Sequence, residues 1–295
     1  MVKVSVILCS YKGDSFIKEQ LESILSQSHD RLEIVVQDDC STDRTAAIVQ
    51  EMQKTDARIK FFPNEKNLGF NRNFESAIQK SNGNWIALCD QDDIWHPEKI
   101  NIMLASHDGK SVLMHCDSVI FKGQPDYSLR QVSFLRRFHG SDARQLFVRN
   151  TVEGHTILFQ RDLLRQAIPF PEGVYFDWWL GYCAAVYGGV QWVNRTLVWR
   201  RIHADNQSNG QEKRVQRLIH TYQAFLNHPS TTAIQREFGQ KLISLLTAKD
   251  KKNLRAYLWQ NRQLVFFFKR KRFFNFLSQK KKLDRLIADL NFENS

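Results

Sequence analysis

The sequence predicts an α/β protein in which a mostly parallel sheet carries helices on both faces. Short apolar runs such as Val4–Cys9 and Trp85–Cys89 have the length of buried strands. Segments with apolar residues at helical spacing alternate with these runs, and that alternation is typical of parallel sheets. Acidic residues follow two of the runs, at Asp38-Asp39 and at Asp90-Gln91-Asp92-Asp93.

The N-terminal part contains predicted strands with a helix after each of the first three. The strands are Val4–Cys9, Leu32–Val36, Ile59–Phe62 and Trp85–Cys89. Helical spacing predicts the three helices. The first covers Phe16 to Leu25, the second begins at the cap Ser41-Thr42-Asp43 and continues to Met52, and the third contains Phe74, Ala77 and Ile78.

The second half of the chain is predicted in less detail. A helix follows Pro97, residues 111–121 form a strand or strand pair, and residues 156–159 and 191–193 form further strands around a helix at Asp177–Tyr187. Residues 122–150 are rich in Arg and Phe and are a candidate lid. From Gln211 onward the pattern is helical.

The two acidic clusters predict a metal and a nucleotide. Open α/β sheets bind ligands just beyond the carboxyl ends of their strands, where both clusters lie. Carboxylates packed within four residues repel one another unless water surrounds them or a hard cation takes their oxygens. The alternative is a solvated acidic turn.

Composition limits the classes of protein that fit. Residues 211–295 hold 18 Lys and Arg against 6 Asp and Glu, a net charge of +12, so the rest of the chain has the remaining −1 of the total +11. Five scattered cysteines without CxxC pairing indicate neither a zinc knuckle nor a disulfide framework and fit a reducing cytoplasm. We expect neither a signal peptide nor a membrane-spanning segment.

Three ordered motifs carry a resemblance to a known family. They are Val4-Ser5-Val6-Ile7-Leu8-Cys9-Ser10-Tyr11, Gln37-Asp38-Asp39-Cys40-Ser41-Thr42-Asp43 and Cys89-Asp90-Gln91-Asp92-Asp93-Ile94-Trp95. Together they resemble the inverting family 2 glycosyltransferases of the GT-A fold. Segments around Glu153, Asp177 and His203 are similar to those of rhamnosyltransferase-like members.

The resemblance implies a domain division. Residues 1–210 form the GT-A catalytic domain, with a nucleotide and donor half at 1–110 and an acceptor half at 111–210, and residues 211–295 form a basic helical C-terminal region. Cys40 departs from the family because glycine is common at its position, so we expect a different loop shape there.

The resemblance also implies a donor site with Mn²⁺ or Mg²⁺. Asp38 or Asp39 accepts the base N–H and Tyr11 lies near the ring; Asp92 is the expected direct metal ligand, Asp90 holds metal, ribose or donor sugar, and His203 is a further metal ligand or phosphate donor. The implied nucleotide- and donor-binding residues are Ser10, Tyr11, Asp38, Asp39, Arg72, Asp90 and Asp92. Taken alone, Tyr11 is a packing aromatic and His203 a structural histidine as readily.

The acceptor side contains the predicted catalytic base. Inversion by single displacement needs a group that takes the acceptor hydroxyl proton, and Asp177, between Phe176 and Trp178, has an apolar setting that raises a carboxyl pKa. Without the family resemblance, Asp177 would be read as a helix cap. Trp178 and Trp179 are the candidate sugar-stacking platform, with core packing as the alternative.

The basic C-terminal region has three interpretations. Clusters such as Lys269–Arg272 and Lys280–Lys282, interleaved with phenylalanines, suit an anionic membrane surface. Alternatively the helices pack on the catalytic domain or on another subunit. Nucleic acid is not expected, because no binding motif occurs.

These observations predict a cytoplasmic enzyme, peripheral on the inner face of the cell membrane through its C-terminal helices. The family resemblance implies that it transfers a sugar onto a cell-surface polysaccharide or lipid-linked glycan, with L-rhamnose from dTDP-rhamnose as the first expectation. A hexosyl or N-acetylhexosaminyl transferase using a UDP-sugar is the alternative. Other classes are a nucleotidyltransferase, for which the Ser10–Gly13 loop is a poor phosphate loop, and a non-catalytic nucleotide-sugar-binding scaffold.

Overall fold

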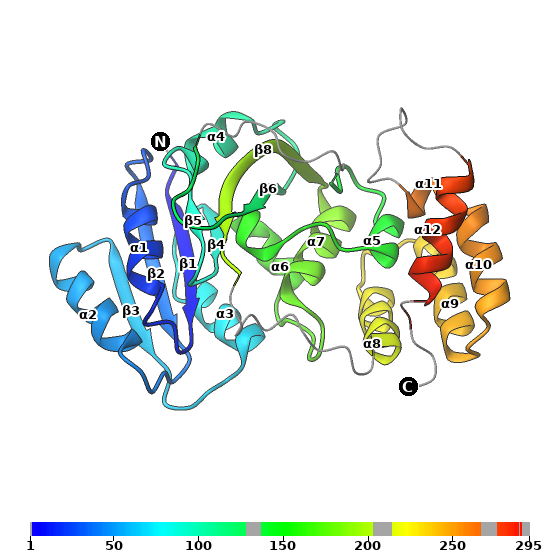
Figure 1. Cartoon of the computed structure of the whole chain (residues 1–295), viewed down its shortest axis with the longest axis horizontal. Helices are drawn as coiled ribbons and strands as arrows, with labels where there is room; N and C mark the ends of the chain where they lie inside the picture. Colours follow the sequence, from blue (N-terminus) through cyan, green and yellow to red (C-terminus); the bar gives the residue numbers. More distant parts are fainter. Residues whose placement is uncertain (1, 128–136, 203–213, 267–275, 289, 291–295) are drawn as a thin grey trace.

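A computed structural model shows the architecture of the protein (Figure 1). It describes residues 2–127, 137–202, 214–266, 276–288 and 290. The predicted ligand His203 and the Lys269–Arg272 cluster lie outside these residues, as does part of the candidate lid.

An eight-stranded sheet has the order β3-β2-β1-β4-β7-β6-β8-β5. The first four of these strands are parallel, and the sheet then becomes mixed, because β7 runs antiparallel to both β4 and β6. The strands are β1 (Val4–Ser10), β2 (Leu32–Asp38), β3 (Ile59–Pro63), β4 (Trp85–Cys89), β5 (Ile94–Trp95), β6 (Leu113–Ile120), β7 (Ile157–Gln160) and β8 (Val190–Arg200). The carboxyl ends of β1, β2 and β4 meet at one edge.

Alternation along the strands divides the core between the two faces of the sheet. On β1, Val4, Val6 and Leu8 pack with the helices α1 (Ile17–Leu25) and α2 (Thr45–Thr55). Ile7 faces the other way, toward α3 (Phe70–Gln79). A strand's side chains point alternately to opposite faces, so a strand buried on both sides reads as one continuous apolar run, as the sequence predicted.

The C-terminal helices share the larger of the two cores with the sheet. Phe147, Tyr182, Phe225 and Phe238 lie in one cluster, and the rings of Tyr182 and Phe225 stack with centroids 4.0 Å apart. The remaining helices are α4 (Lys99–Ala105), α5 (Arg144–Val148), α6 (Leu164–Ala167), α7 (Phe176–Tyr187), α8 (Arg214–Asn227), α9 (Ala233–Thr247), α10 (Lys251–Gln260), α11 (Arg262–Val265) and α12 (Phe276–Ala288). The helices α8 and α9 therefore pack into the core that lies against the sheet.

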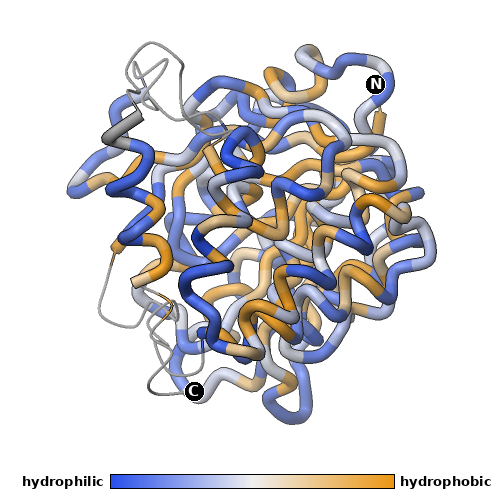
Figure 2. The backbone as a smooth tube through the Cα atoms, turned by 90° about the vertical axis from the view of Figure 1, so that its right-hand side faces the viewer, coloured by the Kyte–Doolittle hydropathy of each residue, from blue (hydrophilic) through white to orange (hydrophobic). Residues whose placement is uncertain are grey.

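Along these C-terminal helices hydrophilic and hydrophobic stretches alternate (Figure 2), as expected of helices that bury one face. Within the described part of the chain, no helix is both long and apolar enough to cross a membrane.

Local signals in the sequence account for the element boundaries. Asp43 accepts hydrogen bonds from Thr45 N (3.0 Å), at the start of α2, and from Asp14 N (3.2 Å), in the loop after β1. Asp43 therefore joins the start of α2 to that loop. Cys40 adopts a φ of +63°, the left-handed conformation that favours glycine. The expected change of loop shape is therefore not needed, because the cysteine takes the left-handed backbone itself. The two-residue strand β5 was too short for any periodicity to predict.

Candidate functional site

Three loops at the carboxyl edge of the sheet are tied together. The side-chain amide of Gln91, between the acidic residues that follow β4, donates to Tyr11 O (3.0 Å) and accepts from Tyr11 N (2.9 Å). Lys12 N donates to Ser41 Oγ (2.9 Å) in the loop after β2. The predicted donor residues Ser10, Tyr11, Asp38 and Asp90 are thus brought to one edge of the sheet.

Asp38 and Asp39 brace these loops from inside. Asp38 accepts from the hydroxyl of Ser10 (2.8 Å) and the backbone N–H of Ser41 (2.8 Å), and it is buried. Asp39 accepts from the N–H groups of Leu68 (2.7 Å) and Gly69 (2.9 Å) and is also buried. Both carboxylates already have internal donors, so their first role is to shape the loops, and contact with a base stays a prediction.

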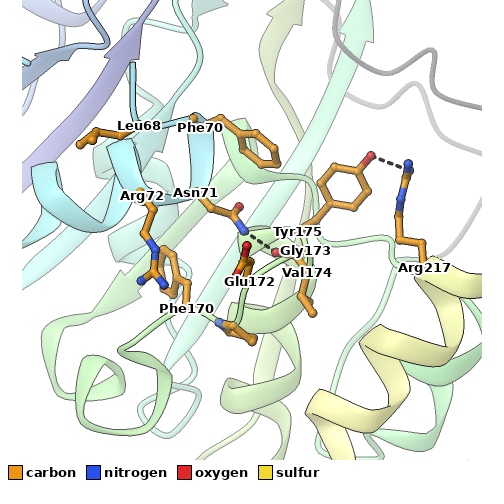
Figure 3. A pocket seen from close by; sticks show the side chains of 12 residues that line it. Leu68, Phe70, Asn71, Arg72, Phe170, Glu172, Gly173, Val174, Tyr175 and Arg217 are labelled. Atoms are coloured by element: carbon orange, nitrogen blue, oxygen red, sulfur yellow. Dashed lines mark hydrogen bonds between the residues drawn. The ribbon is translucent and has the colours of Figure 1, made fainter. Parts of the chain in front are cut away.

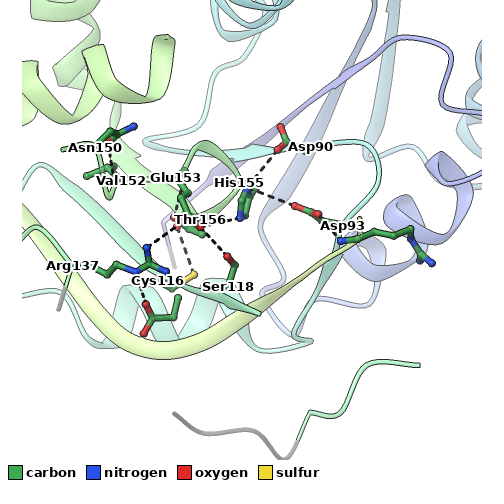
Figure 4. Close-up of polar contacts among 12 residues, drawn as sticks. Asp90, Asp93, Cys116, Ser118, Arg137, Asn150, Val152, Glu153, His155 and Thr156 are labelled. Carbon is green, nitrogen blue, oxygen red and sulfur yellow. Dashed lines mark hydrogen bonds and ion pairs between the residues drawn. The ribbon is translucent and has the colours of Figure 1, made fainter. Parts of the chain in front are cut away.

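A histidine lies among the carboxylates that follow β4 (Figure 4). His155 Nδ1 is 3.4 Å from Asp90 Oδ2 and 3.8 Å from Asp93 Oδ2. Its Nε2 is 3.5 Å from Glu153 Oε2. One ligand atom from each of Asp90, Asp93 and His155 lies within 4.8 Å of the others, a donor set that a divalent cation can use.

Opposite charges stabilise this cluster. Burial alone would lower the pKa of His155, but the carboxylates of Asp93, Asp90 and Glu153 outweigh it and raise the pKa to about 10. Burial raises the pKa of Asp93, and the His155 charge opposes that rise. His155 is therefore an imidazolium that serves as a built-in cation, with both ring nitrogens facing acids.

A second layer holds His155 and Glu153 in place. Arg137 donates to Asp117 Oδ1 (3.1 Å) and to Glu153 Oε1 (3.1 Å), and the Ser118 hydroxyl donates to Glu153 Oε2 (2.8 Å). The ammonium group of Lys99 donates a hydrogen bond to the backbone carbonyl oxygen of His155 (2.8 Å). Lys99 itself is fully buried, with Nζ 3.4 Å from the centroid of the Trp95 ring.

Asp177 lies at the start of α7, against the same cluster. Its Oδ1 accepts from Trp178 N (2.6 Å), and its Cβ is 3.6 Å from where a Cβ on Gly154 would stand. Burial raises its pKa to about 7; the hydrogen bond from Trp178 N opposes this and the negative charge of Asp90 adds to it. Asp177 therefore lies beside Gly154, near enough to Asp90 for the negative charge of Asp90 to raise its pKa.

The other predicted residues have different outcomes. Asp92 is partly buried and is not a member of the Asp90, Asp93 and His155 group. Arg72 pairs with Glu75 (3.0 Å) and lines a cavity whose lining includes none of the other predicted donor residues. The donor-binding assignment of Arg72 therefore gains no contact from the structure.

The stacking platform predicted at Trp178 and Trp179 is wrong. Both side chains are buried, at 9% and 7% exposure. Their indole N–H groups donate to the carbonyl oxygens of Leu146 (2.8 Å) and Ala167 (2.7 Å). Because α7 is buried on nearly every side, both tryptophans belong to the core, as the alternative interpretation held.

The sequence analysis singled out neither His155 nor Arg137 as a functional residue. The available signal was the unusual Glu153-Gly154-His155 segment, in which a histidine lies two residues from an acid just before a strand. Arg137 lies in the irregular stretch 122–150, where no periodicity shows what a side chain meets.

Comparisons with known proteins identify the family of the chain. The profile of glycosyl transferase family 2 matches residues 5–167. An uncharacterized glycosyltransferase of Haemophilus influenzae is 40% identical over 108 residues, 36% of this chain and 33% of that protein. A GalNAc(5)-diNAcBac-PP-undecaprenol beta-1,3-glucosyltransferase of Campylobacter jejuni is 36% identical over 94 residues, 32% of this chain and 30% of the relative. These alignments span about a third of each relative.

Solved structures share the fold over the whole chain. S. aureus TarS 1-349 in complex with UDP-GlcNAc has a TM-score of 0.63 at 20% identity, covering 99% of this chain and 89% of the 1-349 chain. The mannosyltransferase PcManGT from Pyrobaculum calidifontis, in complex with GDP-Man and Mn²⁺, has a TM-score of 0.60 at 17% identity, covering 100% of this chain and 88% of PcManGT. These likenesses show the fold alone.

The sheet, the acidic edge and the profile match together define a GT-A-type α/β protein. The chain belongs to glycosyl transferase family 2.

The buried ion network predicts a measurable contribution to stability. Arg137→Met leaves Asp117, which is 1% exposed at its side chain, without its cation. Because an unpaired buried charge is costly, we expect the free energy of unfolding to fall by about 2–4 kcal/mol in urea denaturation. Adding Asp117→Asn should restore part of this loss, because it removes the uncompensated charge.

Arg165→Met is the matched control, since the Arg165–Asp162 pair is exposed and should contribute at most about 1 kcal/mol. Equal stability of Arg137→Met and the native protein would contradict a structural role for the network.

Proposed function

We propose that the protein is an inverting glycosyltransferase that moves a sugar from a nucleoside diphosphate sugar onto a hydroxyl of a glycan or lipid-linked acceptor. The observation that carries the proposal is Asp177, a carboxyl group with a pKa raised to about 7, placed against the acidic edge where Asp90 lies. Family 2 membership supports sugar transfer. The lipid-linked acceptor rests on the undecaprenol named for the Campylobacter relative.

In this reaction Asp177 acts as general base. The acceptor hydroxyl oxygen bonds to the anomeric carbon while the bond from that carbon to the diphosphate oxygen breaks, and the electron pair leaves with the nucleoside diphosphate. The hydroxyl proton goes to a carboxylate oxygen of Asp177. A base with a pKa near the working pH is efficient at this transfer. Attack on the face opposite the leaving group inverts the anomeric configuration.

A divalent cation, Mn²⁺ or Mg²⁺, fits the donor set at this edge. The Asp90 side chain is 46% exposed and offers carboxylate oxygens, the ligands that hard cations prefer. We assign the cation to Asp90 and Asp92 rather than to His155, because the His155 ring would first have to lose a proton held by three carboxylates. When bound, the metal would neutralise charge on the leaving diphosphate. His155 holds Asp90 from the protein side.

The donor we propose first is dTDP-L-rhamnose, from the sequence resemblance. A UDP-hexose or UDP-N-acetylhexosamine is the second candidate, because UDP-GlcNAc is the ligand named for TarS. A non-catalytic scaffold has less support, since a buried carboxyl group costs stability and a binding protein would gain nothing from Asp177.

Substituting the proposed base tests the mechanism. In Asp177→Asn the shape of the side chain is kept but it cannot accept the proton, so we expect the transfer rate to fall by about 10²–10⁴-fold, with donor binding retained in calorimetry. In the native enzyme, kcat/KM should rise as the pH increases through about 7, because Asp177 must be deprotonated. A fully active Asp177→Asn variant would rule out this base.

We also propose that the enzyme associates peripherally with anionic membranes through its basic C-terminal region. Support comes from the +12 charge of residues 211–295 and from the Lys280–Lys282 cluster on α12. Each cation near an anionic bilayer surface contributes about 1 kcal/mol. Because α8 packs into the catalytic core, the test keeps the full chain and changes charges only.

Replacing Lys280, Lys281 and Lys282 with glutamine should weaken binding to phosphatidylglycerol-containing liposomes on the order of a hundredfold in sedimentation assays. The control replaces the exposed Lys18, Lys54 and Lys66, which should change binding little. Equal loss in both triple variants would point to total charge instead of a membrane-facing helix.

A further inference from the structure

A cavity of about 480 Å³ lies between the start of α3, the loop before α7 and the helix α8 (Figure 3). This volume is within the range of small-molecule sites. Its lining includes Leu68, Phe70, Asn71, Arg72, Glu172, Tyr175 and Arg217. The lining includes none of Asp38, Asp39, Asp90 and Asp93, and it touches the acidic edge only where Leu68 N and Gly69 N donate to Asp39.

Exposed rings give this cavity an apolar wall. Phe70 is 43% exposed and Tyr175 is 37% exposed, and their ring centroids are 5.8 Å apart. Leu68, beside them, is 38% exposed. Large apolar side chains left open at a cavity mark a binding surface, and aromatic rings with a polar tip suit ligands that have both apolar and polar groups.

The cavity is connected to the proposed base through Asn71. The Asn71 side chain donates to Val174 O (2.5 Å) and accepts from Phe176 N (3.2 Å). It therefore fixes the backbone that carries Tyr175 on one side and leads to Asp177 on the other. Tyr175, whose ring lines the cavity, precedes Asp177 by two residues in the chain, on the segment that Asn71 holds.

The two arginines that line the cavity differ in whether a carboxylate pairs with them. Arg72 is neutralised by Glu75 (3.0 Å). Arg217 donates to the hydroxyl of Tyr175 (2.8 Å) and lies 5.3 Å from its ring centroid, and in the described parts of the chain it has no carboxylate within ion-pair distance. Glu172 is an exposed carboxylate of the same lining. Arg217 is thus available to an anion, which Glu172 would weakly repel.

We propose that this cavity is the acceptor subsite and that it selects a sugar with an anionic substituent, the ring lying on Phe70 and Tyr175 and the anion on Arg217. The inference rests on the proposed function, because it supplies the acceptor of that reaction. A guanidinium matches the geometry of both carboxylates and phosphates, so the shared chemistry is an anionic group on a glycan.

Ligand-observed NMR titration of the full chain tests this subsite. The probes are methyl β-glucuronide for a carboxylate, glucose 6-phosphate for a phosphate and methyl β-glucoside as the neutral sugar. We expect at least one anionic sugar to bind about tenfold more tightly than the neutral one, since a hydrogen bond to a charged group is about twice as strong as a neutral one. The preferred anionic probe identifies the source of the charge.

Three variants sharpen the test. Arg217→Gln should remove the preference for the anionic sugar, Arg217→Lys should restore part of it, and Glu172→Gln should strengthen anionic binding a few-fold. Arg165→Gln, which removes an exposed arginine elsewhere, should bind as the native protein does. Melting temperatures establish that each variant is folded.

Equal binding of neutral and anionic sugars, or an unchanged preference in Arg217→Gln, would overturn the inference. Hydrolysis of nucleotide sugars by the native protein without acceptor, measured separately, tests the proposed function. Hydrolysis without anion preference therefore contradicts the subsite alone. Anion preference without hydrolysis of any donor supports anionic-sugar binding at this cavity but contradicts the proposed function and, with it, the acceptor role of the cavity.

Discussion

The candidate site depends on the ionic interaction between the protonated ring of His155 and the carboxylates around it. Asp90, Asp93 and Glu153 converge on this ring within 3.4–3.8 Å. In a partly desolvated site such acids would repel one another and take up protons. Because the cationic ring of His155 holds Asp90 from the protein side, the exposed side of the Asp90 carboxylate stays open to solvent. The carboxyl edge of the sheet is therefore preorganised to bind a cationic or metal-bound ligand.

The fold places the His155 ring by joining segments that are distant in sequence. Asp90 and Asp93 follow β4, whereas His155 precedes β7, the strand that pairs antiparallel with β4. Gly154 lets α7 approach, because a Cβ there would come within 2.9 Å of the Phe176 ring. The switch from parallel to antiparallel pairing at β4–β7 is therefore what sets the base, the acids and the histidine side by side.

Sequence reasoning found the parts of the site that follow from strand ends and failed where contacts between distant segments decide. Asp90 could be placed because it follows an apolar strand. The assignment of Asp177 as the base came from the family resemblance, because its position at the start of an apolar helix alone indicates a cap. The role of His155 could not be predicted, because two of its three acidic partners, Asp90 and Asp93, lie more than sixty residues away in the chain. Trp178 and Trp179 were misassigned as a stacking platform because helical spacing does not show that α7 is covered on nearly all sides. At Cys40 the sequence predicted a changed loop shape, but the residue adopts the left-handed backbone conformation that favours glycine.

The most direct measurement is a thermal-shift screen of UDP, dTDP, GDP and CMP, each with and without Mn²⁺. A ligand that binds only the folded protein raises the melting temperature. At a ligand concentration of a hundred times its dissociation constant, it adds about 2.7 kcal/mol to the free energy of unfolding. The account predicts a rise for at least one nucleoside diphosphate that depends on Mn²⁺, with dTDP indicating rhamnosyl transfer and UDP a hexose or N-acetylhexosamine donor. No shift with any of the four would contradict a nucleotide-sugar site at the Asp90 edge.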